Sequence, residues 1–165
     1  MKNPIFLDKN IQRVENFVQK YYSKKRTLKN GYPVFSSIEI SLNGACNRRC
    51  EFCPRVSKKE YPNLYQSLDF SDFKKMIGDL NKINFEGRIS FSGFCEPLLT
   101  KNINDYIQLI RKELPKVNID MVSNGDVITK KNFKKVLENL FGSGLDTIRL
   151  SLYDGPHQVD YFQDI

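Results

Sequence analysis

Three of the four cysteines fall within the run Cys46-Asn47-Arg48-Arg49-Cys50-Glu51-Phe52-Cys53, at the spacing C-x3-C-x2-C. Thiolates are soft ligands, and clustered cysteines select zinc, copper(I) or an iron–sulfur cluster. A structural zinc site takes four protein ligands, whereas this run supplies three and the single histidine, His157, is far away in sequence. Three cysteines on a [4Fe–4S] cube would leave one iron open to a small molecule.

The sequence on either side of this run predicts an α/β fold. Apolar residues that alternate predict strands over 37–42, 88–91, 117–122 and 147–152. Apolar residues at helical spacing predict helices over 9–22, 71–83, 103–114 and 129–140. Ser71 and Thr129 are the expected helix caps, and residues 54–68 indicate a long loop. Strands that alternate with crossover helices predict a parallel sheet of about four strands, preceded here by an N-terminal helix.

A polar or glycine-containing motif stands at the end of each predicted strand. Besides the cysteine run, these are Gly93-Phe94-Cys95-Glu96-Pro97, Ser123-Asn124-Gly125 and Ser151-Leu152-Tyr153-Asp154-Gly155. Reactive groups in parallel α/β folds gather at the carboxyl ends of the strands. Turn residues are common there for structural reasons alone, but this does not explain three cysteines at the same edge. We therefore expect the motifs to form one site.

The pattern Cys-Asn-x-x-Cys-x-Phe-Cys-Pro, from Cys46 to Pro54, resembles the cluster loop of the radical S-adenosylmethionine (radical SAM) enzymes. The later motifs match that family in the expected order, so the resemblance extends from about Ser37 to Asp154. It implies an incomplete (βα)6 partial barrel. Residues 34–165 would form its first four βα units, after a basic helix and linker over 1–33. The loop also resembles members that carry a C-terminal auxiliary-cluster domain.

The resemblance assigns each motif a role. Cys46, Cys50 and Cys53 would hold three irons of a [4Fe–4S] cluster, and the fourth iron would bind the amino and carboxylate groups of S-adenosylmethionine. The residues that would surround S-adenosylmethionine are Phe52, Gly93, Cys95, Glu96, Pro97, Ser123, Asn124 and Ser151. Simple core packing is the alternative for Phe52, and strand-end capping is the alternative for Ser151. The implied chemistry assigns no residue to acid–base catalysis.

Cys95 departs from the family pattern, because glycine is usual at this place. Glycine permits a positive φ, which would strain a cysteine. A tolerated substitution is the favoured interpretation, since a buried free cysteine behaves as a small hydrophobe. A functional thiol beside the cofactor and a fourth cluster ligand are the alternatives.

The reaction implied by the resemblance is reductive cleavage of S-adenosylmethionine. An electron donor such as flavodoxin or ferredoxin would supply one electron through the cluster. Cleavage of the C5′–S bond would give methionine and a 5′-deoxyadenosyl radical, which abstracts hydrogen from a substrate. The substrate stays open between a peptide, a protein, a sugar and RNA. The alternative function is a non-catalytic zinc- or iron–sulfur-binding module that uses Cys46, Cys50 and Cys53, with or without Cys95.

Positive charge is concentrated at the N-terminus. The chain has a net charge of +7, and residues 1–33 carry eight Lys and Arg against Asp8 and Glu15, a net of +6. Such an arm could attract RNA, which makes an RNA-modifying radical SAM enzyme a further alternative, although a solvated helix face is simpler. No apolar run approaches the ~20 residues that span a bilayer. With no disulfide framework, we expect a cytoplasmic protein without a membrane partner.

Overall fold

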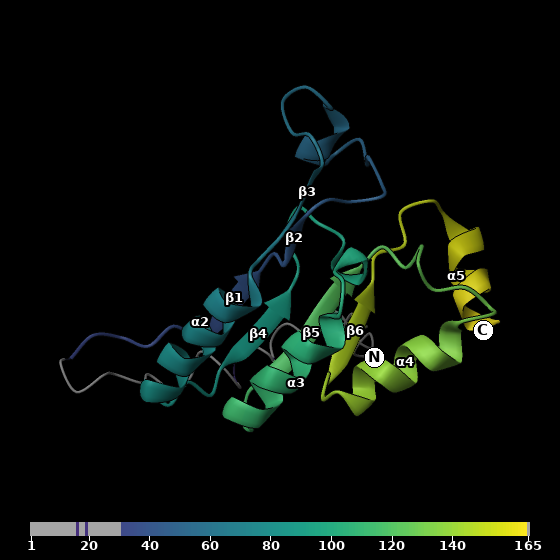
Figure 1. Ribbon diagram of the computed structural model, residues 1–165. Helices are drawn as coiled ribbons and strands as arrows, with labels where there is room; N and C mark the ends of the chain where they lie inside the picture. Colours follow the sequence, from purple (N-terminus) through teal and green to yellow (C-terminus); the bar gives the residue numbers. More distant parts are fainter. Residues whose placement is uncertain (1–15, 17–18, 20–30, 165) are drawn as a thin grey trace, which may run out of the picture.

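The main sheet has four parallel strands, as predicted. The computed structural model describes Asn16, Gln19 and residues 31–164, so the helix predicted over 9–22 and the basic arm fall largely outside the described residues. The strands stand in the order β1-β4-β5-β6, which is also their order along the chain (Figure 1). Their bounds are β1 Ser37–Ile40, β4 Arg88–Phe91, β5 Asn118–Ser123 and β6 Thr147–Leu150.

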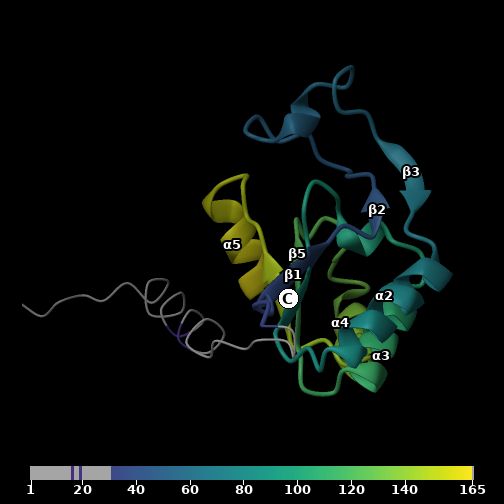
Figure 2. The same ribbon diagram turned by 90° about the vertical axis from the view of Figure 1, so that its left-hand side faces the viewer.

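Three helices cover one face of this sheet and bury the hydrophobic core against it. They are α2 (Phe70–Lys82), α3 (Ile103–Glu113) and α4 (Phe133–Gly142), all on the same side in Figure 2. The core includes the sheet residues Ile89, Phe91, Ile119 and Met121, which are fully buried. Burying such side chains contributes about 1.5–3 kcal/mol each. The core therefore fixes the strands whose carboxyl ends carry the predicted motifs.

Two helix caps differ from the prediction. The N-cap of α2 is Asp69, whose carboxylate accepts a hydrogen bond of 2.7 Å from the backbone N–H of Ser71. Asp and Ser cap helices about equally well, so the residue types alone do not separate Asp69 from Ser71. The fourth predicted helix likewise begins later, at Phe133. Asn132 precedes it and accepts a hydrogen bond from the backbone of Thr129, which therefore lies in the turn before the helix.

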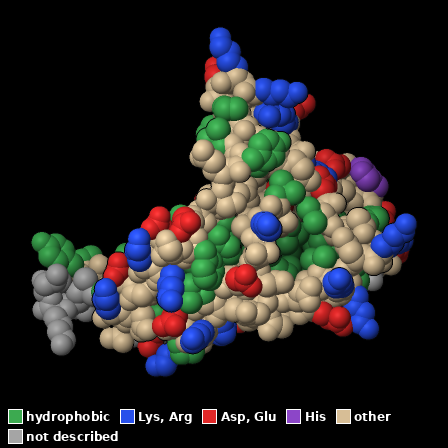
Figure 3. Space-filling view, viewed as in Figure 1, with side chains coloured by type: hydrophobic (Ala, Val, Ile, Leu, Met, Phe, Trp, Pro, Cys, Tyr) green, Lys and Arg blue, Asp and Glu red, His purple; other side chains and the backbone are tan. Residues whose placement is uncertain are grey.

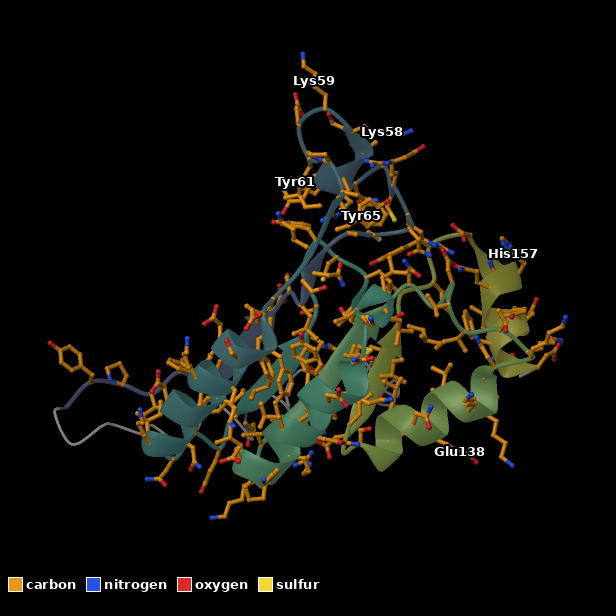
Figure 4. The ribbon with its side chains drawn as sticks, in the orientation of Figure 1. Lys58, Lys59, Tyr61, Tyr65, Glu138 and His157 are labelled. Atoms are coloured by element: carbon orange, nitrogen blue, oxygen red, sulfur yellow. The ribbon has the colours of Figure 1, made fainter. Side chains whose placement is uncertain are left out.

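A two-stranded arm projects from the sheet where a long loop was predicted. β2 (Asn43–Gly44) pairs antiparallel with β3 (Leu64–Ser67). The chain between them, which includes the cysteine run, belongs to the projection seen in Figure 1 and, as a surface, in Figure 3. All four residues of β3 are exposed, so the alternation that predicts a strand is missing there. A short 3-10 helix, Pro54–Val56, follows the cysteines. Lys58 and Lys59 lie at the tip of the arm in Figure 4.

The chain also forms a helix that the sequence did not predict, α5 (Pro156–Gln163). The helix begins at Pro156, directly after Gly155. It has no strong apolar stripe, so the spacing of apolar residues in the sequence does not predict it. In Figure 2, α5 lies on the side of the sheet opposite α2, α3 and α4. A second 3-10 turn, Pro97–Leu99, follows β4. Among the described residues, no helix combines the length and apolar character needed to cross a membrane.

Candidate cluster and cofactor site

The arm and the carboxyl ends of the strands enclose a hollow of about 540 Å³ that is open to solvent. Most of the residues predicted for the site line it, namely Cys46, Cys50, Phe52, Cys53, Gly93, Cys95, Glu96, Ser123, Asn124 and Ser151. Pro97 does not, because it is fully buried at the start of the 3-10 turn after β4. The lining residues that the sequence did not single out are Arg48, Arg55, Phe94, Val122 and Tyr153.

The three cysteines of the run are free, half-buried thiols on one short loop. The backbone N–H of Cys53 donates to the carbonyl of Cys50 at 2.9 Å, which turns the loop back on itself. Cys46 Sγ accepts hydrogen bonds from the backbone N–H of Arg48 at 3.4 Å and from Asn124 Nδ2 at 3.7 Å. Burial and the neighbouring Cys46 raise the pKa of the Cys50 thiol. The bond from Asn124 links the Cys46 side chain to the segment that follows β5.

Arg48 ties the cysteine run to the ends of β5 and β6. Its Nε lies 2.7 Å from Asp126 Oδ2, and its Nη2 lies 2.7 Å from Asp154 Oδ2. The Arg48 side chain is only 15% exposed, and the two carboxylates raise the pKa of its guanidinium. Asn47 reinforces the same link, since its amide donates to Asp126 and accepts from Asn124 Nδ2 at 2.8 Å. The loop is therefore anchored across the strand ends by charge-assisted hydrogen bonds.

Arg55 holds the other side of the loop from a buried position. It is 3% exposed, and its guanidinium donates to the carbonyls of Gly44 (2.7 Å) and Phe94 and to Asn63 Oδ1 (2.8 Å). Asn63 in turn accepts from the backbone N–H of Cys46 and donates to its carbonyl. Arginine side chains are mostly exposed in proteins, so the residue type alone would place Arg55 on the surface. The only signal in the sequence is that Arg55 follows the Cys53-Pro54 pair directly.

The motif after β4 shows why its glycine is needed and its cysteine is tolerated. Gly93 has φ +102°, and a Cβ there would lie 2.3 Å from Ser41 Oγ. Cys95 is not in the left-handed region, where the only non-glycine residues in the described chain are Asn84 and Asn102. Cysteine therefore replaces glycine without backbone strain. Burial raises the pKa of the Cys95 thiol, which keeps it protonated at neutral pH.

Glu96 lines the hollow, but its side chain is buried and its carboxylate is bound by donors of the protein. It is 1% exposed and accepts hydrogen bonds from Ser123 Oγ (2.8 Å), Asn124 N (2.8 Å) and Leu98 N (3.0 Å). Burial raises the pKa of Glu96, and these donors oppose that rise. Removing a carboxylate from water is unfavourable unless donors replace the lost hydration. Glu96 thus joins the end of β5 to the turn after β4 and shapes the wall of the hollow.

Two aromatic side chains stand at the mouth of the hollow. Phe52 is 70% exposed and Tyr153 is 51% exposed. Their ring centroids are 4.8 Å apart, with the planes 69° from each other. Core packing, the alternative for Phe52, does not apply to a side chain that exposed. Paired aromatic faces open to solvent can stack on a flat ring of a ligand.

Comparison with known proteins agrees with this arrangement. The family model of the Radical SAM superfamily matches residues 40–161. The chain is 34% identical over 106 residues to the S-adenosyl-L-methionine-dependent 2-deoxy-scyllo-inosamine dehydrogenase of Niallia circulans, which covers 64% of the chain and 41% of the relative. It is 31% identical over 120 residues to a GTP 3',8-cyclase of Corynebacterium glutamicum, covering 70% of the chain and 30% of the relative.

One solved structure has a fold similar to that of this chain. It is the crystal structure of BtrN in complex with AdoMet and 2-DOIA, with a TM-score of 0.69 and 27% identity. The match covers 80% of this chain and 52% of the BtrN chain. The chain therefore spans about half the length of BtrN, and less than half the length of the two curated relatives.

Proposed function

The chain belongs to the radical SAM superfamily, and on that basis we propose that it binds a [4Fe–4S] cluster and S-adenosylmethionine in the hollow described above. Cys46, Cys50 and Cys53 are the cluster ligands in this proposal. S-adenosylmethionine occupies the space between the cysteine run and the ends of β4, β5 and β6. The activity in this proposal is hydrogen abstraction from a substrate.

The observation that carries the proposal is the convergence of four separate motifs on one hollow. Its lining comes from the cysteine run and from the ends of β4, β5 and β6, segments up to about a hundred residues apart in sequence. The cysteine run supplies three soft thiolate ligands, the type that an iron–sulfur cluster requires, whereas a structural zinc site takes four protein ligands.

When bound, the cluster and S-adenosylmethionine supply electron transfer and a carbon radical, which is chemistry that side chains lack. The residues of the chain bind and orient these groups. Arg48 and Arg55 hold the cysteine run from two sides, which fixes the backbone of the run against the strand ends. Phe52 and Tyr153 line the hollow, and in this proposal their exposed rings would stack on the adenine. In this proposal the electron comes from a donor protein such as flavodoxin or ferredoxin.

Anaerobic reconstitution with iron and sulfide, followed by electron paramagnetic resonance of the reduced protein, tests this proposal. A [4Fe–4S] signal that changes on addition of S-adenosylmethionine is the expected result. A cluster signal that ignores S-adenosylmethionine would contradict the assignment of the hollow. Zinc bound in place of iron and sulfide would favour the non-catalytic module instead.

The substrates named for the relatives differ in charge. One relative is named for an inosamine, which carries an amine, and the other for GTP, which carries a triphosphate.

A further inference from the structure

Arg55 places a buried positive charge in the wall of the hollow. The residue is 3% exposed, and it lines the hollow together with Cys46, Cys50 and Cys53. A guanidinium stays protonated in proteins, so burial does not remove its charge. Burying a charge is unfavourable unless hydrogen bonds and an opposite charge replace the lost hydration. The partners of Arg55 therefore bear on what the hollow binds.

The hydrogen-bond acceptors of this guanidinium are all neutral. They are the backbone carbonyls of Gly44 (2.7 Å), Pro62 (3.3 Å) and Phe94, and the side-chain oxygen Oδ1 of Asn63 (2.8 Å). The ring centroid of Tyr61, a residue that Figure 4 shows on the projecting arm, lies 4.9 Å from Arg55 Cζ. Among the residues that the structure describes, no carboxylate forms an ion pair with Arg55. The hydrogen bonds are therefore in place, but the described chain supplies no opposite charge.

The other charged residues that line the hollow differ from Arg55. Arg48 is paired with two carboxylates, those of Asp126 and Asp154. Glu96 is bound by neutral donors, and burial raises its pKa, so this group can lose its charge by binding a proton. Arg55 has no such route, because a guanidinium does not give up its proton. Within the described lining, Arg55 is therefore the buried charge that is both permanent and without a counterion.

A cluster held by three thiolates would supply the opposite charge. The thiolates outweigh the positive charge of the oxidised cube, so the assembly is an anion. Uptake of one electron from the donor protein makes this anion more negative, and no bond or proton changes at Arg55. A positive charge nearby stabilises the more negative state more strongly and so raises the reduction potential. Net charge and hydrogen bonds around a cluster are among the factors that set its potential.

We propose that Arg55 is the counterion of the bound cluster, and that its charge raises the potential at which the cluster takes up its electron. This inference rests on the proposed function, which assigns the cluster to Cys46, Cys50 and Cys53. Arg55 then has two separable roles: its planar fork holds the arm through neutral oxygens, and its charge acts on the cluster. Because Nη2 bonds only to Gly44 within the described chain, one of its two N–H groups is left for a hydrogen bond to a bound group.

A redox titration of the anaerobically reconstituted chain at neutral pH, followed by electron paramagnetic resonance, separates the two roles. Arg55→Gln removes the charge, whereas Arg55→Lys keeps a charge and loses the fork. We expect Arg55→Gln to shift the reduction equilibrium about tenfold toward the oxidised cluster, which is a potential lower by about 59 mV for one electron. Arg55→Lys should keep most of the native potential.

The direction of the shift distinguishes the effect of charge from that of structure. A loosened arm alone would admit water to the cluster, and water stabilises the more negative state, so the potential would rise. Arg111→Gln is the control, because Arg111 also donates to backbone carbonyls but lies at the opposite ends of the strands. The potential of this variant should match that of the native chain.

The remaining outcomes each decide a separate point. An unchanged or raised potential in Arg55→Gln, or an equal fall in Arg55→Gln and Arg55→Lys, would overturn the counterion. The proposed function would stand in that case if the native cluster signal still responds to S-adenosylmethionine. If Arg55→Gln assembles no cluster, retention of iron by Arg55→Lys supports the counterion, and equal loss of iron in both variants overturns it. Absence of a cluster from the native chain would overturn the proposed function and the counterion together.

Discussion

Gly93 matters through its backbone conformation and its lack of a side chain. With φ +102° and Ser41 Oγ 2.3 Å from a Cβ position, Gly93→Ala combines left-handed strain with a steric clash. The strain alone costs roughly 1–2 kcal/mol. We expect urea unfolding to show a loss of about 2 kcal/mol or more, and the wall of the hollow to shift. Gly78→Ala is the control, because nothing lies within 4 Å of its Cβ and it is helical. It should stabilise the chain by about 0.5–1 kcal/mol, and equal stability of the two variants would contradict the argument.

The buried carboxylate of Glu96 makes stability depend on pH. Burial raises its pKa above the ordinary value of 4.5, so the folded chain holds the proton more tightly than the unfolded chain. The resulting stabilisation is complete below the unfolded pKa and is lost as pH rises through the folded pKa. Glu96→Gln removes this titration. The free energy of unfolding of the native chain, minus that of the variant, should therefore fall as pH rises from about 4.5. Urea unfolding of both chains at several pH values measures this difference.

Exposed Glu138 provides the comparison for Glu96. Glu138→Gln should show no such trend, because that side chain is exposed on α4 with only a 3.9 Å contact to Lys134. An advantage of native Glu96 that grows with pH would mean that the three donors outweigh burial. The direction of the slope therefore decides which of the two effects controls this carboxylate.

The lining residues that can be predicted from sequence are those that belong to compact motifs. The cysteines, Gly93 and Asn124 each stand at a strand end with a recognisable local pattern, and the parallel fold brings these ends together. Arg48 and Arg55 could not be found this way, because their partners come from distant segments. Asp126 lies 78 positions from Arg48, and Phe94 lies 39 positions from Arg55. Glu96 lines the hollow, but the direction of its carboxylate depends on donors at the end of β5 and just after it.

At the scale of an element, Arg55 is one of the residues that join the projecting arm to the sheet. Lysine keeps the charge but lacks the planar fork, so one ammonium group cannot reach oxygens of Gly44, Asn63 and Phe94 together. We expect Arg55→Lys to loosen the arm without unfolding the sheet. Backbone hydrogen exchange should accelerate over residues 43–67 and stay unchanged in β4 and β5.

Arg111 is the matched control for Arg55. It also donates to backbone carbonyls, those of Gly144 and Val117, but it lies at the opposite ends of the strands. Arg111→Lys should raise exchange near its own partners and leave the arm as it was. Acceleration across the whole chain in Arg55→Lys would show that the arm and the sheet unfold as one unit.

The elements that the sequence missed share a physical reason. Prediction of α2, α3 and the sheet strands succeeded because each buries an apolar stripe or face in the common core. β3 buries none of its residues, and α5 buries only Gln158 along its length. Their apolar residues therefore do not recur at strand or helix spacing, and the sequence pattern does not predict them. They form instead through backbone pairing with β2 and through packing of Phe162 at Gly125.

Across the whole molecule, the core and the candidate cluster site are separate. The core lies between the sheet and α2, α3 and α4, and it contains no cysteine. The cysteine run stands beyond the strand ends, on the arm. Loss of a cluster ligand should therefore remove the cluster without removing the fold, and this separation makes the ligand assignment testable by substitution.

Cys50→Ala is the sharpest form of that test. Because the Cys50 side chain lies outside the core, we expect the circular dichroism spectrum and the thermal midpoint of the cluster-free chain to stay close to those of the native sequence. After anaerobic reconstitution the iron-to-protein ratio should fall steeply, since two thiolates hold a cube poorly. Cys95→Gly should keep its iron, because Cys95 lies unstrained at a position that the family fills with glycine. A normal iron ratio in Cys50→Ala would refute the ligand set, and iron loss in Cys95→Gly would make Cys95 a ligand.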